Sequence, residues 1–88
     1  MHGLFLGVDV AKDKVDVHVR PSGERLTVGT DETGLGELVT WVRERAPALV
    51  VLEATGGYEV VVAATLGSAG LPVAVVNPRQ IRDFARAT

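Results

Sequence analysis

The chain has 88 residues, 47% of them hydrophobic and 23% charged, with ten glycines, no cysteine and a formal net charge of −2. This composition is typical of one small globular domain and excludes a disulfide framework, a thiolate zinc site and a cysteine nucleophile. A chain of this length buries only about 60–65% of the surface that its unfolded form exposes, so we expect marginal stability.

The amino-terminal run MHGLFLGVDV is too short for a membrane span and lacks the basic region and cleavage site of a signal peptide. We therefore expect a cytoplasmic protein without a membrane partner. Residues 79–88 contain three arginines and one aspartate, a balance of +2, so the other 78 residues sum to −4. Contact with nucleic acid is therefore expected to be local.

The first third of the chain predicts an antiparallel meander. Residues 4–10 are nearly all apolar, which predicts a central strand covered on both faces. After a polar turn at 12–14, valines alternate with polar residues over 15–20, as in a half-buried strand. A turn at 21–23 then leads into an outer strand over 24–29.

The apolar period next changes from that of a strand to that of a helix. An amphipathic helix is predicted over 32–45, and Pro47 ends it. Its apolar residues, spaced i, i+3, i+4 and i+7, are Leu35, Leu38, Val39 and Val42. The residues available to cap it are Thr30, Asp31 and Thr33.

Strands and helices alternate from there to the end of the chain. An apolar strand over 48–53 ends in Glu53, and a loop leads into a helix over 58–68. A strand over 71–76 follows, and then a last helix from Pro78. The apolar side of that helix carries Ile81, Phe84 and Ala85.

The predicted order is therefore β-β-β-α-β-α-β-α in a single domain spanning 1–88. An antiparallel meander followed by helical crossovers between parallel strands gives an α/β fold. We expect one mixed sheet with helices on both faces. RNase H-like domains use this order of elements.

Two carboxylates stand in apolar strands. Asp9 lies within the most hydrophobic strand, where an unpaired buried charge costs several kcal/mol, and Glu53 ends a neighbouring one. A register that sets the two side by side would suit Mg²⁺, which takes oxygen ligands. The alternative is that Asp9 faces a turn and Glu53 caps the next loop, and the pattern alone leaves both interpretations open.

Two further signals concern phosphate. Arg79, Arg82 and Arg86 follow i, i+3 and i+7 spacing, so one helix face is basic and suits phosphate contact. The alternative is an ordinary solvated face partly balanced by Asp83. The Gly56-Gly57 loop before a helix either cradles a phosphate or only makes a turn, and the turn is the default interpretation.

Three blocks carry a resemblance to a known family: GVDVAKDKVDV at 7–17, LEATGGYE at 52–59 and VNPRQIRDFARA at 76–87. Together they resemble the amino-terminal domain of the DEDD transposases of the insertion-sequence-110 family, relatives of pilin-gene invertases. That domain is RuvC-like and holds Mg²⁺ with four acidic residues. The resemblance implies that Asp9 and Glu53 are the first two of these, as metal ligands and catalytic residues.

The resemblance further implies DNA as the partner, a guide RNA in the intact protein, and nucleic-acid contact by Arg79, Arg82 and Arg86. The family's other two acidic residues follow the arginine-bearing helix, and its serine nucleophile lies in a carboxy-terminal domain. The chain stops at Thr88 before either. We therefore expect a domain incomplete at its carboxy-terminal end, with an incomplete Mg²⁺ site and no activity by itself.

Two other interpretations stay open. One is the phosphate-binding half of an actin-like or sugar-kinase ATPase, which shares the fold and opens with an acidic strand-turn-strand. The other is a non-catalytic module that binds nucleic acid or assembles, with apolar surfaces forming a homo-oligomer.

Overall fold

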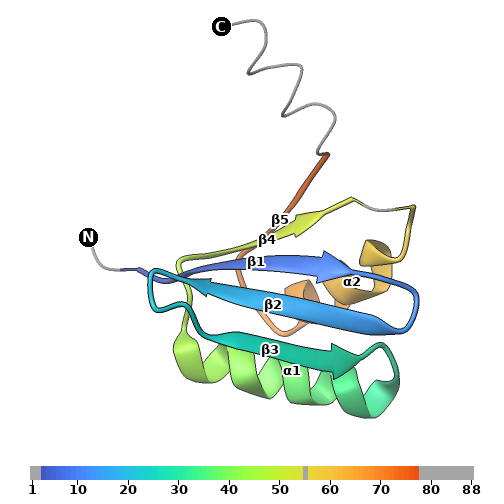
Figure 1. The fold of residues 1–88 in the computed structure, drawn as a ribbon, viewed down its shortest axis with the longest axis horizontal. Helices are drawn as coiled ribbons and strands as arrows, with labels where there is room; N and C mark the ends of the chain where they lie inside the picture. The colour runs from blue at the N-terminus through green and yellow to red at the C-terminus, as the bar shows by residue number, and fades with distance from the viewer. Residues whose placement is uncertain (1–2, 55, 78–88) are drawn as a thin grey trace, which may run out of the picture.

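The computed structural model describes residues 3–54 and 56–77, which form a five-stranded mixed sheet and two helices (Figure 1). The strand order is β3-β2-β1-β4-β5, with antiparallel pairing among the first three strands and parallel pairing of β1 with β4 and of β4 with β5. The elements are β1 (Phe5–Val10), β2 (Lys14–Arg20), β3 (Arg25–Gly29), α1 (Glu32–Arg45), β4 (Leu49–Glu53), α2 (Glu59–Ser68) and β5 (Val73–Val76). The predicted order is confirmed as far as β5.

The core lies on one face of this sheet. On the central strand β1, Leu6, Val8 and Val10 are buried, and each stands opposite a buried valine of β2. Both helices pack against this face and join a single hydrophobic cluster. Their buried apolar residues are Leu35, Leu38 and Val42 from α1 and Val62 and Leu66 from α2.

The opposite face of the sheet is open in the part of the chain that the structure describes. Phe5 is 48% exposed, and Gly7 and Asp9 are exposed too, so β1 is not covered on both faces as its apolar sequence predicts. The reason is topological. The crossovers from β3 to β4 and from β4 to β5 step across the sheet in the same direction, so crossovers of one hand place α1 and α2 on one face. The helix predicted from Pro78 lies outside the described residues.

Local chemistry fixes the ends of both helices. Of the three candidate caps for α1, Asp31 is the one used, because its Oδ1 accepts the Gly34 N–H at 2.9 Å. After α2, Gly70 has a φ of 82°, and the following Leu71 N–H donates to the Leu66 carbonyl at 3.2 Å. These contacts define where α1 begins and where α2 ends.

An ion pair joins the end of α1 to the turn between β2 and β3. Arg45 Nη2 lies 2.8 Å from Glu24 Oε2, and the guanidinium stacks 3.5 Å above the Trp41 ring. The hydrogen bond from Arg45 holds the pKa of Glu24 below its usual value. Neither described helix is long and apolar enough to cross a membrane.

Two glycines of α1 provide a test of this packing. A Cβ at Gly34 would overlap the carbonyl oxygen of Gly29 and lie 2.8 Å from Asp31 Oδ1, whereas a Cβ at Gly36 meets nothing within 4 Å. We predict that Gly34→Ala destabilises the fold by about 1–3 kcal/mol and that Gly36→Ala stabilises it by about 0.5–1 kcal/mol. Urea unfolding followed by circular dichroism measures both, and equal effects would contradict the packing of α1 against β3.

Candidate functional site

The pairing of β1 with β4 brings the two predicted carboxylates together. Val8 pairs with Leu52, and one step further along the same parallel register lie Asp9 and Glu53. Both are exposed, and both line a hollow of about 240 Å³ on the open face. The prediction that the two carboxylate-bearing strands are neighbours is confirmed.

One premise of the sequence argument is wrong. Asp9 was expected to be a buried charge that needs compensation, but it is exposed because both described helices lie on the other face. Desolvation therefore gives no reason for a cation at Asp9. What supports a cation here is the proximity of a second carboxylate on the adjacent strand.

The donor set fits Mg²⁺. Two exposed carboxylates offer hard oxygen donors, and Mg²⁺ is commonly bound by one or two carboxylates while it keeps waters and contacts substrate phosphates. Over residues 3–54 and 56–77, no group of three or more His, Cys, Asp or Glu side chains gathers to hold a metal ion. In the described part, Asp9 and Glu53 are the carboxylates that line the hollow on the open face and could serve as a pair of ligands.

A third carboxylate, Asp16, lies on β2 directly opposite Asp9. Asp16 pairs with Asp9 in the antiparallel register, and its Oδ1 accepts a hydrogen bond from Thr27 Oγ1 at 2.6 Å. Lys14 Nζ lies 3.7 Å from its other oxygen. The hydrogen bond from Thr27 and the charge of Lys14 hold the pKa of Asp16 below its usual value. The lowered pKa favours the ionised form of Asp16, whose charge beside Asp9 is partly offset by Lys14.

Basic residues follow on the same face, toward the other end of β1. His18 stands opposite Gly7 on one side and Arg25 on the other, and Arg20 stands opposite Phe5. His18 and Arg20 line the hollow that holds the two carboxylates. Sequence reasoning assigned these residues no role, although the alternation of β2 already placed His18 and Arg20 on the polar side of that strand.

The predicted nucleic-acid-binding residues Arg79, Arg82 and Arg86 lie outside the described residues.

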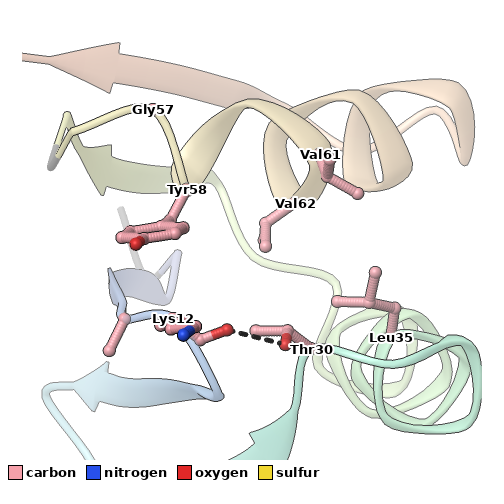
Figure 2. Close-up of a pocket in the computed structure, with 8 residues that line it drawn as sticks. Lys12, Thr30, Leu35, Gly57, Tyr58, Val61 and Val62 are labelled. Carbon is pink, nitrogen blue, oxygen red and sulfur yellow. Dashed lines mark hydrogen bonds between the residues drawn. The ribbon is translucent and has the colours of Figure 1, made fainter.

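A second hollow, of about 270 Å³, lies on the helix side and is shown in Figure 2. Lys12, Thr30 and Tyr58 line it with apolar side chains from both helices, and Thr30 Oγ1 donates to the Lys12 carbonyl at 3.1 Å. The Gly57 N–H donates to Glu59 Oε1 at 3.0 Å, so this amide is already engaged. Gly56 and Gly57 have φ values of 70° and 97°, and the loop makes a turn.

Three comparisons with known proteins bear on this site. Residues 6–88 match the family model DEDD_Tnp_IS110, described as a transposase. The comparison with curated proteins found no match.

Solved structures share the fold. The structure of RuvC from T. thermophilus in complex with a Holliday junction substrate has a TM-score of 0.62 and 17% identity, and the match covers 93% of this chain and 69% of that one. An inorganic polyphosphate/ATP-glucomannokinase from Arthrobacter sp. strain KM has a TM-score of 0.57 and 16% identity, covering 86% of this chain and 44% of that one. The predicted RNase H-like, RuvC-like α/β fold is confirmed.

The hydrogen bond between Thr27 and Asp16 leads to a prediction about pH. Thr27→Val keeps the β-branched shape but removes the donor, so we predict that the pKa of Asp16 rises toward the usual aspartate value. A carboxyl NMR titration measures this directly. Thr40→Val, on α1, is the matched control and should leave the pKa of Asp16 unchanged.

The same bond has a stability consequence whose sign follows from the lowered pKa. The folded state binds the proton of Asp16 less readily than the unfolded state, so the stabilisation is present at neutral pH and is lost as pH falls through the folded pKa. The difference in unfolding free energy between wild type and Thr27→Val should therefore shrink in acid. A difference independent of pH would show that Thr27 acts through packing alone.

Proposed function

The chain belongs to the DEDD_Tnp_IS110 transposase family, and we propose that it forms the RuvC-like, metal-binding domain of a transposase that acts on DNA. Residues 1–88 form one structural unit in this proposal, with Asp9 and Glu53 as the ligands and catalytic residues that it contributes. The observation that supports it is the parallel register of β1 and β4, which sets the two carboxylates in one hollow of the open face.

Three carboxylates of this chain have different roles in binding the cation. Asp9 and Glu53 hold the ion from two adjacent strands, whose buried neighbours Val8 and Leu52 fix their spacing. Asp16, held ionised by Thr27, adds negative potential that favours a cation at Asp9. When bound, Mg²⁺ supplies charge stabilisation at the oxygens of a phosphodiester undergoing displacement.

The proposal extends to partners through the family. We propose that the protein works in the cytoplasm on DNA, with a guide RNA and as a homo-oligomer. Arg79, Arg82 and Arg86 contact the nucleic-acid backbone in this proposal, since guanidinium groups suit phosphate. The match of the transposase family model over residues 6–88 supports this extension.

The alternative of a sugar-kinase-like ATPase half rests on fold alone, because the glucomannokinase is 16% identical and this chain spans 44% of its length. The Gly56-Gly57 loop, where a phosphate was considered, has its Gly57 N–H engaged by Glu59. A nucleotide with Mg²⁺ is therefore not expected to raise the melting temperature of the chain.

The metal proposal is tested with Mn²⁺, a paramagnetic stand-in for Mg²⁺. We predict that Mn²⁺ broadens the amide NMR signals nearest the carboxylate pair, among them those of Val8, Val10 and Leu52. Asp9→Asn should abolish this selective broadening because it removes one of two charged ligands. Asp13→Asn, the same change in the nearby β1–β2 turn, is the control and should leave it intact.

Broadening that survives both Asp9→Asn and Glu53→Gln would contradict the assignment of these two residues as metal ligands. So would broadening centred on another part of the chain.

A further inference from the structure

Most charged side chains on the open face of the sheet fall into two groups, although Lys14 pairs with Asp16 at the acidic end. The carboxylates Asp9, Asp16 and Glu53 gather toward the carboxyl ends of β1 and β4. The basic residues His18, Arg20 and Arg25 gather toward the amino end of β1. Asp16 and His18 are two residues apart on β2, which corresponds to about 6.6 Å along the strand.

Two hollows share walls. His18 and Arg20 line the hollow that contains Asp9 and Glu53, and they also line a third hollow, of about 570 Å³, whose walls include Arg25 and Glu24. We call these two adjoining hollows the groove.

The two arginines of this groove differ from those elsewhere in the described structure. On α1, Arg43 donates to the Ala69 carbonyl and Arg45 pairs with Glu24, so both have structural roles. Over residues 3–54 and 56–77, Arg20 and Arg25 take part in no hydrogen bond or ion pair through their side chains. Their guanidinium groups are exposed and available for an anion.

Nothing in the described residues requires glycine at position 7. Gly7 lies in the middle of β1, its φ is not positive, and a Cβ built on it would meet no described residue within 4 Å. Glycine weakens a strand interior, and one cause of its presence there is the close approach of a ligand. Gly7 lines the hollow that contains Asp9 and Glu53. Two residues before it on β1, the exposed ring of Phe5 offers a surface on which a base can stack.

We infer that the groove over Gly7, from Asp9 and Glu53 to His18, Arg20 and Arg25, binds the backbone of one nucleic-acid strand. The phosphodiester at the carboxylate pair is the one that the metal contacts, and the basic residues bind phosphates further along the same strand. This inference rests on the proposed function for the identity of the first position. Its own content is the arginine-lined track, whose positive charge is complementary to phosphates and needs no metal.

The test is binding of a fluorescent 20-nucleotide single strand, measured by anisotropy in EDTA across a series of salt concentrations. EDTA removes divalent cations, so the experiment measures binding without the metal. Its failure is therefore distinguishable from failure of the Mn²⁺ experiment. Arg20→Gln and Arg25→Gln should each weaken binding and reduce the slope of log K against log salt by about 0.7, the value for one phosphate contact on a single strand. The matched control is Arg43→Gln, which removes the same charge from the helix side and should change the slope least.

Gly7→Val provides a second variant that removes no charge. It should fill the groove and weaken binding with the slope unchanged, while its strand propensity and the open space above Gly7 keep the fold intact by circular dichroism. The same sequence as DNA and as RNA identifies which strand the groove prefers. Absence of binding by the wild type at low salt overturns the inference. Equal effects of Arg20→Gln, Arg25→Gln and Arg43→Gln also overturn it.

Discussion

Parallel pairing of β1 with β4 positions the core and the candidate site at once. Val8 and Leu52 pair in register and are buried against the helices, so the next residues, Asp9 and Glu53, point to the opposite face. Slipping one strand by a single residue would expose its apolar side chains, each worth about 1.5–3 kcal/mol of burial, and turn its carboxylate toward the core. Burial of the apolar side chains on one face therefore determines that the two carboxylates lie on the other face.

The topology assigns different tasks to the two faces. Because both described crossovers step across the sheet in one direction, α1 and α2 share a face and build the core there. In the described part of the chain no helix covers the other face, and its side chains are exposed or half-buried. Its carboxylates lie toward Asp9, where Lys14 pairs with Asp16, and its other basic residues lie toward Arg20. The proposed metal position beside exposed arginines would suit a phosphodiester strand, because Mg²⁺ and guanidinium groups both bind phosphate oxygens.

Local signals in the sequence predicted most of the fold. An apolar run predicted β1, alternation predicted β2 and the turn at 21–23 predicted the start of β3. Helical periodicity predicted α1, and one of its three candidate caps, Asp31, is the cap that the structure uses. Burial was predicted less well, since an apolar run does not reveal which neighbours cover it. Asp9 is exposed, and Val75 is 49% exposed on the edge strand β5. The partners of Asp16 and Arg45 lie 11 and 21 residues away, so only the folded register shows them.

The central claim is that Asp9 and Glu53 bind one divalent cation between β1 and β4. A crystal structure of the chain grown with Mn²⁺, with data collected for its anomalous signal, tests this most directly. The account predicts one anomalous peak within ligand distance of a carboxylate oxygen from each residue, about 2.0–2.2 Å for an ion of this class. A Mn²⁺ peak bound elsewhere, with neither carboxylate as a ligand, would contradict it.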